Sequence, residues 1–171
     1  MEGNGSFDSE ESKAVLAECD VVITNPPFSL IRKFFTTLLE YDKDFIFIGT
    51  VLFATFNCVL PSVMNGKLKC GYNERIKELY EVPKEYKEKY AQKIKEIDGK
   101  YYININNTTW FTSFDRDDKP FLELTKSYNE KDYPKYDNAD AIEVKRTKNI
   151  PKDYYGIMGV PVTFFQKYNK D

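Results

Sequence analysis

The chain has 171 residues, of which 42% are hydrophobic and 30% charged, and 25 basic against 27 acidic side chains give a net charge of −2. This composition excludes a disordered tail, a collagen-like repeat and a strongly cationic nucleic-acid clamp. The sequence contains no histidine. That excludes a Ser-His-Asp or Cys-His nucleophile and any histidine-based metal centre, and we expect no bound metal.

The N-terminal segment and the cysteines indicate the compartment. Cys19, Cys58 and Cys70 show no C-x-x-C spacing and are typical of reduced thiols in a cytoplasmic protein. Met1 to Asp8 lacks the basic region of a signal peptide, and every apolar stretch is shorter than the ~20 residues of a membrane helix. We therefore expect a cytoplasmic protein with no membrane segment.

The first expected elements are a helix and a strand. Asp8 to Cys19 is predicted to be a surface helix with Ser9 as its N-cap. Asp20 to Thr24 is largely β-branched, which favours a strand of a parallel sheet buried on both faces. The prolines of Asn25-Pro26-Pro27-Phe28 end this strand, because they cannot donate to a ladder.

A second helix and strand follow at once. Ser29 is the expected cap of a helix over Leu30 to Tyr41, and Phe45 to Ile48 has the pattern of another buried strand. A helix, strand, helix, strand order with short connections is typical of an α/β fold with a parallel pair.

The remaining elements are less regular. A charged helix is expected over Lys84 to Ile97, solvated and docking one aromatic stripe, with a partner-binding helix as the alternative. The others are a helix over Phe56 to Met64, strands over Lys67 to Tyr72, Tyr101 to Asn106, Thr109 to Phe114 and Ala141 to Arg146, and a hairpin at Asn106-Asn107. Without a repeat or a low-complexity linker, we expect one domain over residues 1–171.

The motif with chemical potential is Asn25-Pro26-Pro27-Phe28, at the carboxyl end of a predicted parallel strand, where open α/β sheets bind ligands. The Asn25 side-chain oxygen and the Pro26 carbonyl can both accept hydrogen bonds, and Phe28 offers a flat ring beside them. These groups suit a planar substrate with an amino group, such as adenine, cytosine or a glutamine amide. The alternative is a turn that merely ends the strand.

Longer segments resemble the adenine-specific amino-group DNA methyltransferases, most closely the EcoRI-type modification methylases, whose catalytic motif is [DNS]-P-P-[YF]. The segments are Val21 to Leu30, Glu40 to Gly49, Trp110 to Thr112, Tyr133 to Asn138, Asp140 to Val144, Ile150 to Tyr154 and Gly159 to Phe164. The resemblance implies an S-adenosylmethionine-dependent, Rossmann-like fold, with a mixed sheet and flanking helices. It also implies methyl transfer to N6 of an adenine flipped out of double-stranded DNA, in a restriction-modification context. Asn25, Pro26, Pro27 and Phe28 would then be the catalytic residues.

The resemblance also sets an expectation about the cofactor. Such enzymes bind S-adenosylmethionine through a glycine-containing loop upstream of the catalytic motif, whereas only 24 residues precede Asn25 here and none forms a G-x-G after a strand. We therefore expect a fold lacking the cofactor-loop strands, starting near the third strand, and weak or no cofactor binding by this chain alone. Phe7 is the one residue that matches the aromatic contact to the cofactor adenine.

Four basic residues indicate a DNA contact. Lys145, Arg146, Lys148 and Lys152 lie within eight positions, which favours a phosphate-contacting edge, with an ordinary solvated surface as the alternative.

Two further functions stay open beside the DNA methyltransferase: a non-catalytic remnant or accessory chain of such an enzyme, and a protein-glutamine or RNA-base methyltransferase. If the neighbouring strand of the family fold is absent, Asp20 to Thr24 becomes an edge with apolar side chains on both faces. We then expect self-association through this strand or a requirement for a missing N-terminal half.

Overall fold

The chain folds into two compact units, and each unit is built from two separate segments of the sequence. The computed structural model describes residues 6–71, 79–90, 93–104, 107–115 and 122–168. One unit consists of Met1–Val51 and Cys70–Ser113, and the other of Leu52–Lys69 and Phe114–Asp171. The expectation of one domain over residues 1–171 stays a prediction.

A parallel pair of strands forms the start of the first unit. Helix α1 (Glu10–Glu18) begins at the expected N-cap, where the Ser9 side chain accepts a hydrogen bond from Ser12 N, and it leads into β1 (Val21–Thr24). Helix α2 (Ile31–Glu40) then crosses over to β2 (Asp44–Thr50), which pairs with β1 in parallel. The predicted α/β crossover is therefore confirmed.

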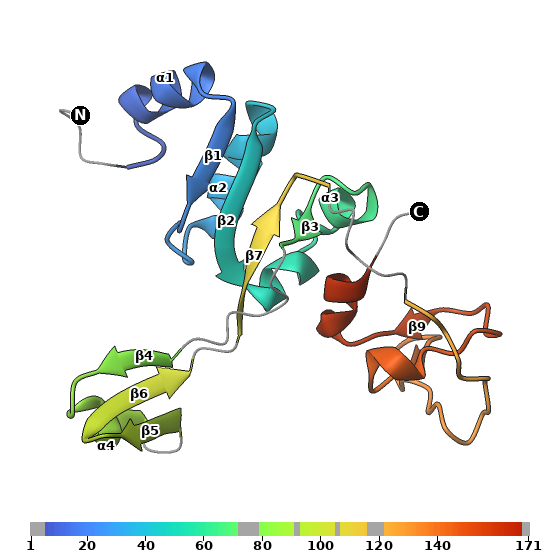
Figure 1. Ribbon diagram of the computed structural model, residues 1–171. Coiled ribbons are helices and arrows are strands. Elements are labelled where there is room, and N and C mark those ends of the chain that lie inside the picture. The colour runs from blue at the N-terminus through green and yellow to red at the C-terminus, as the bar shows by residue number, and fades with distance from the viewer. Residues whose placement is uncertain (1–5, 72–78, 91–92, 105–106, 116–121, 169–171) are drawn as a thin grey trace. The chain divides into compact units, whose positions relative to one another are not determined.

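The rest of this sheet comes from distant parts of the chain. Its order is β1-β2-β7-β3 (Figure 1), with β7 (Thr108–Thr112) antiparallel to β2 and β3 (Lys69–Cys70) on the other side of β7. The sheet is therefore mixed, as expected. The expected hairpin at Asn106-Asn107 is wrong, because the strands before and after it belong to different sheets. Asn106 itself lies outside the described residues.

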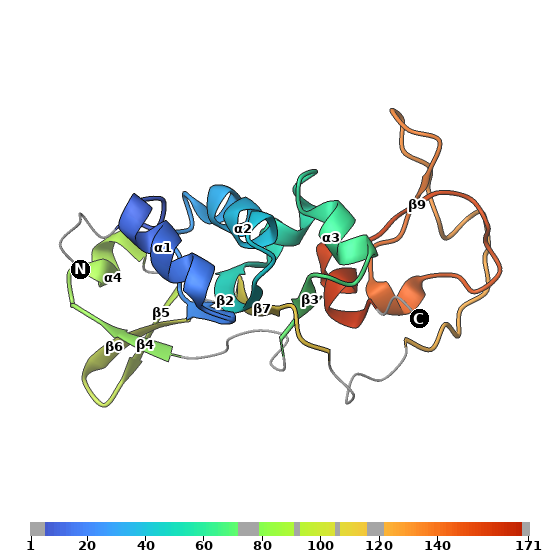
Figure 2. The ribbon, with the colours of Figure 1, turned by 90° about the horizontal axis from the view of Figure 1, so that it is seen from above.

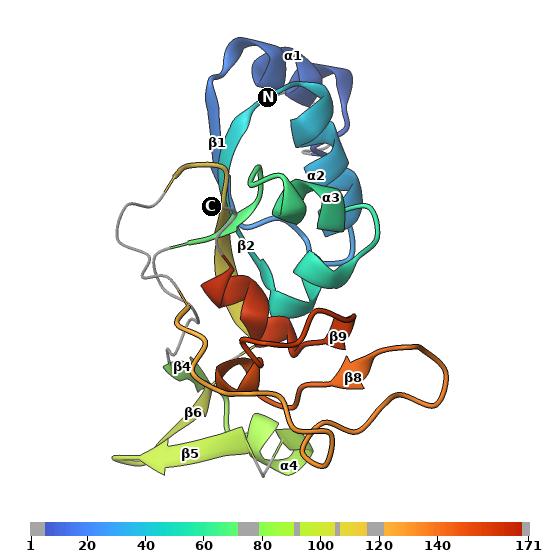
Figure 3. The ribbon, with the colours of Figure 1, turned by 90° about the vertical axis from the view of Figure 1, so that its right-hand side faces the viewer.

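Aromatic packing explains why α2 covers one face of the sheet (Figure 3). Phe35 of α2 meets Phe45 of β2 edge-on, with ring centroids 5.6 Å apart, and Phe47 stacks on Phe111 of β7 at 5.4 Å. The buried apolar residues of this layer are Ile31, Phe34, Phe35, Leu38, Phe45, Phe47 and Phe111. This layer holds β1 and β2 in place and so positions the residues that follow β1.

Strand β1 is not buried on both faces, contrary to the sequence expectation. Val21 is 39% and Ile23 is 70% exposed, and β1 is the last strand of the sheet. The register places Ile23 beside Ile46, on the face opposite α2, which the described residues cover only partly. The expectation that Asp20 to Thr24 forms an open edge is therefore confirmed for the described residues.

A small antiparallel sheet occupies residues 79–104, within the first unit. Its order is β4-β6-β5, from β4 (Leu79–Val82), β5 (Ile94–Ile97) and β6 (Lys100–Asn104), with helix α4 (Tyr86–Tyr90) on one side (Figure 2). The predicted helix over Lys84 to Ile97 is thus wrong in its second half. Asp98 and Gly99 have φ of 50° and 75°, and this two-residue turn fixes a β5–β6 hairpin.

The described residues of the second unit form only short helices and strands. Its elements are η1 (Val51–Thr55), α3 (Leu60–Met64), β8 (Ile142–Glu143), η3 (Thr147–Asn149), β9 (Met158–Gly159) and η4 (Val162–Lys167). The first residue of η1, Val51, still belongs to the first unit. The expected helix over Phe56 to Met64 shortens to α3, because Pro61 fits only its first turn. The expected strand over Ala141 to Arg146 shortens to β8, which pairs with β9 in parallel. Tyr133, Ile142, Val144 and Ile150 form one of its buried apolar clusters.

None of the helices in the described ranges is long and apolar enough to cross a membrane.

Candidate functional site

The Asn-Pro-Pro-Phe motif lies at the carboxyl end of β1, directly after Thr24. Asn25 is exposed, Pro26 is buried, and the Phe28 ring is 43% exposed. The buried proline anchors the turn to the protein, while the residues on either side of it stay accessible. The motif therefore presents an amide and a ring to solvent from a fixed backbone.

Backbone hydrogen bonds shape the turn from the motif into α2. The Pro27 carbonyl accepts from Leu30 N at 2.9 Å, and the Phe28 carbonyl accepts from Ile31 N at 3.5 Å. The expected Ser29 cap is wrong: Leu30 is the N-cap, and no side chain makes the capping hydrogen bond. The diproline and the following turn start the helix without a side-chain cap.

Two acceptor oxygens lie in adjacent residues of this turn. In the ranges that the structure describes, no hydrogen bond uses the Asn25 side chain or the Pro26 carbonyl. Both oxygens belong to adjacent residues of one restrained backbone segment. A ligand that donates to either oxygen would therefore break no hydrogen bond of the described residues.

Phe7 packs close to the start of α2. Its ring meets Phe34 edge-on, with centroids 5.7 Å apart, and Lys33 Nζ lies 6.0 Å from its centroid. Lys33 also donates to the Asp8 carboxylate, which accepts a further hydrogen bond from the Ser6 hydroxyl. These two bonds, that of Lys33 first, lower the pKa of Asp8 from 3.8 to about 2. The structure thus places Phe7 against the first turn of the helix that follows the motif.

The residues around Phe7 do not by themselves fit S-adenosylmethionine. The Ser6 hydroxyl and the Asp8 carboxylate, which flank Phe7 in sequence, are already bonded to one another, and Asp8 also accepts a hydrogen bond from Lys33. Phe7 therefore offers one apolar surface to a ligand.

The four predicted DNA-binding residues lie in the second unit. Lys145, Arg146, Lys148 and Lys152 are all exposed, and they precede, form and follow the short helix η3. Sequence reasoning missed Lys126, whose carbonyl accepts from Lys152 N at 2.9 Å. No local sequence signal brings these two lysines together, because a bridge between distant segments does so.

A metal site is not visible among the residues that are described: no group of three or more cysteine, aspartate or glutamate side chains there can hold an ion.

A mixed sheet with flanking helices, whose parallel strand runs into an Asn-Pro-Pro-Phe turn, fits a methyltransferase. Residues 1–171 match the family described as adenine-specific methyltransferase EcoRI, and the chain belongs to that family. The resemblance inferred from the sequence is thereby confirmed.

Three curated relatives are similar over nearly the whole chain. The Type II methyltransferase M.EcoRI of Escherichia coli is 41% identical over 99% of this chain and 53% of its own length. M.MgeORF184P of Mycoplasma genitalium is 38% identical (99% and 55%), and M.MpnI of Mycoplasma pneumoniae is 36% identical (99% and 54%). The chain therefore spans about half the length of the curated relatives it matches. No solved structure matches it.

Proposed function

We propose that this chain forms the target-base part of a DNA methyltransferase that transfers a methyl group to N6 of adenine in double-stranded DNA. The observation that carries this proposal is the pair of unused acceptors, the Asn25 side-chain oxygen and the Pro26 carbonyl, beside the exposed ring of Phe28. Family membership and the relatives named Type II methyltransferases support it and suggest a restriction-modification context.

The geometry suits an amino group attached to a flat ring. The lone pair of the adenine amino nitrogen is delocalised into the ring, so this nitrogen is a poor nucleophile. If the amino group donates one hydrogen bond to Asn25 Oδ1 and one to the Pro26 carbonyl, the lone pair becomes localised on the nitrogen. Phe28 would stack on the flipped base and hold it in place, a contact worth ~1–3 kcal/mol. No histidine is needed, in agreement with the composition.

S-adenosylmethionine is the methyl donor that the family implies, and we propose that residues outside this chain complete its site. The polar groups beside Phe7 are occupied, and the sequence has no glycine loop after a strand. We expect little or no heat in a calorimetric titration of the chain with S-adenosylmethionine. A micromolar dissociation constant for the chain alone would contradict this expectation.

The open edge of β1 supports a proposal about assembly. An interior strand of a parallel sheet has apolar residues on both faces, whereas natural edge strands carry charges, prolines or bulges. Val21 and Ile23 are apolar and exposed, so we propose that β1 pairs with a further strand. That strand belongs either to a part of a Rossmann-like methyltransferase sheet outside these 171 residues or to a second copy of this chain.

The decisive experiment measures methylated nucleosides. Unmethylated DNA is incubated with S-adenosylmethionine and the chain, with and without the part of M.EcoRI that the match does not cover. We expect N6-methyladenine in the presence of both parts, and none when the chain carries Asn25→Ala. Methylation of cytosine or of protein glutamine would favour another acceptor. A complex that binds S-adenosylmethionine and DNA without methylating would support a non-catalytic remnant.

A further inference from the structure

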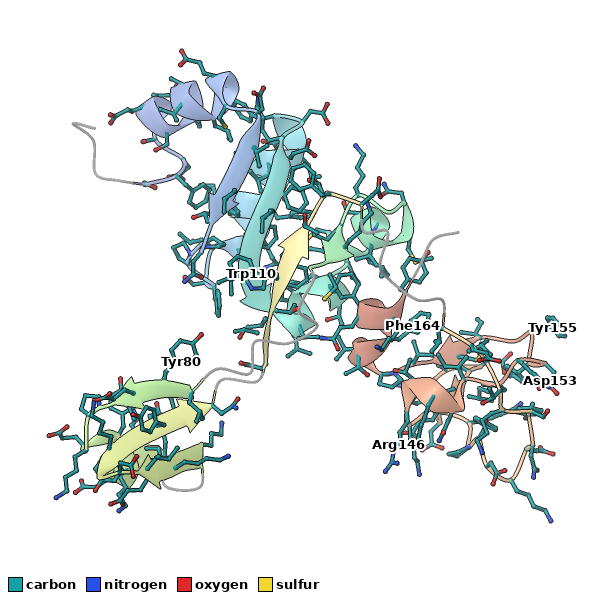
Figure 4. All side chains as sticks on the ribbon, viewed as in Figure 1. Tyr80, Trp110, Arg146, Asp153, Tyr155 and Phe164 are labelled. Carbon is teal, nitrogen blue, oxygen red and sulfur yellow. The ribbon has the colours of Figure 1, made fainter. Side chains whose placement is uncertain are left out.

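Among the described residues of the second unit, the most exposed large hydrophobic side chain is an aromatic ring. Tyr155 is 97% exposed and Ile157 is 71% exposed, with only Gly156 between them. We call residues 155–157 the tip. Figure 4 shows Tyr155 at the outer end of the loop that also carries Asp153, well apart from Arg146. A fully exposed aromatic ring gives up the stabilisation that burial would provide, and its whole surface is available to a partner.

The backbone on both sides of the tip is tightly held. Before the tip, Asp153 Oδ1 accepts from Tyr128 N at 2.6 Å, and the Tyr154 ring lies 4.6 Å from the Tyr128 ring. After it, the Ile157 carbonyl accepts from Ile142 N at 3.1 Å. The exposure of Tyr155 is therefore imposed by a structured frame and is not the result of a loose loop.

Packing inside the loop adds to this frame. A Cβ atom at Gly156 would lie 2.6 Å from Tyr154 Oη, so the chain passes directly beside that ring. Tyr128 in turn stacks on the buried Tyr133, whose hydroxyl donates to the Asn149 carbonyl at 2.8 Å. The packed rings of Tyr154, Tyr128 and Tyr133 thus fix the loop from which Tyr155 extends into solvent.

Two exposed lysines and one carboxylate lie near the tip along the backbone. Lys152 precedes it by three residues and is exposed, and the backbone bond from Lys152 N to the Lys126 carbonyl brings a second exposed lysine alongside. The nearby carboxylate of Asp153 is bonded to Tyr128 N. An exposed aromatic ring in a loop whose backbone also carries two exposed lysines suits a base flanked by phosphates.

We propose that the tip contacts the target DNA, with Tyr155 stacking on a base that has lost its neighbour and Lys126 and Lys152 contacting the flanking phosphates. The inference rests on the proposed function, because base flipping creates such a gap in the duplex and an inserted side chain can fill it. Ile157 contributes apolar area on the same tip.

The test uses the 171-residue chain and two fluorescent duplexes that differ only in one central abasic site, with binding followed by anisotropy. The unmodified chain binds the abasic duplex more tightly than the continuous one. Tyr155→Ala weakens binding to the abasic duplex roughly 5- to 150-fold, the range of one lost stacking contact, and abolishes the preference. Tyr155→Phe keeps the ring and the preference.

Matched variants control for other effects. Tyr86→Ala removes an exposed ring from the other unit and leaves both affinities unchanged. Lys126→Gln with Lys152→Gln lowers the slope of log affinity against log salt by roughly 2, on both duplexes. Because Tyr155 is almost fully exposed, its variants keep the thermal midpoint of the parent chain.

The experiment distinguishes a failure of the inference about the tip from a failure of the proposed function. If Tyr155→Ala leaves the affinity for the abasic duplex unchanged, the tip has no such role, whatever the enzyme does. If the unmodified chain binds neither duplex, DNA binding by this part of the methyltransferase is contradicted, and the inference about the tip falls with it.

Discussion

At the scale of single residues, the proposed function gives the side chains around Asn25 separable tasks. Phe28 is half exposed and in the proposed mechanism is only a surface for the base, so its removal should cost stacking without disturbing the fold. In the completed enzyme we expect Phe28→Ala to weaken target binding by about 1–3 kcal/mol, whereas Phe28→Tyr keeps most of it. The measurement is the fluorescence of 2-aminopurine at the target position, which rises when the base leaves the stack. An equal loss for both variants would argue against stacking.

Asp8 provides a pH-dependent prediction at the same scale. Lys33 donates to its carboxylate and lowers its pKa to about 2, so the ionised form is favoured in the folded protein. The resulting contribution to stability is fully present above the ordinary pKa of 3.8 and is lost as the pH falls through about 2. Lys33→Met should return the pKa of Asp8 towards 3.8 in an NMR titration. A value that stays near 2 in this variant would assign the shift to Ser6 instead.

At the scale of elements, local signals explain which predictions hold. The Ser9 cap, the β-branched residues of β1 and the apolar face of α2 each act within a few residues, and these elements form as expected. The segment from Lys84 to Ile97 differs, because its helical spacing competes with the turn at Asp98-Gly99. That turn pairs Ile94–Ile97 with β6 and overrides the helical pattern.

The candidate site was predictable to a similar degree. Asn25 to Phe28 form one contiguous motif, so the sequence alone locates them. The Phe7 contact with Phe34, the approach of Lys126 to Lys152 and the exposure of Tyr155 all depend on pairing or packing between distant segments. The amino-acid composition and the spacing of residues in the sequence do not indicate these contacts.

Gly71 should not tolerate a larger side chain, because its backbone lies close to Trp110 of β7. A Cβ there would lie 2.5 Å from Trp110 Cβ and 3.3 Å from the Trp110 carbonyl oxygen, and atoms at the backbone cannot move aside freely. We expect Gly71→Ala to lower the free energy of unfolding by about 1–3 kcal/mol, as overpacking usually does. Urea unfolding measures this loss, with Lys67→Ala at an exposed position as the control. An unchanged midpoint would show that β3 can shift away from β7.

At the scale of the whole molecule, the open edge of β1 leads to a prediction about assembly. Without a partner strand, we expect the isolated chain to associate through Val21 and Ile23, in a concentration-dependent way seen by light scattering. Ile23→Lys should suppress this association, because a charge on an edge strand opposes pairing. Val15→Lys, at an exposed position of α1, is the matched control. A clean monomer whose Val21 to Ile23 amides are protected from hydrogen exchange would contradict the proposal.

The position of β7 between β2 and β3 has a consequence for how the chain folds. Phe47 and Phe111 face each other in the sheet, although the whole of the β4-β6-β5 sheet lies between them in sequence. The β5–β6 hairpin, with its two-residue turn, can form in roughly 1–10 μs, whereas pairing across a long loop is slow. We therefore expect the inserted hairpin to fold first and shorten the loop that must close. The docking of β7 onto β2 is then the step that sets the folding rate.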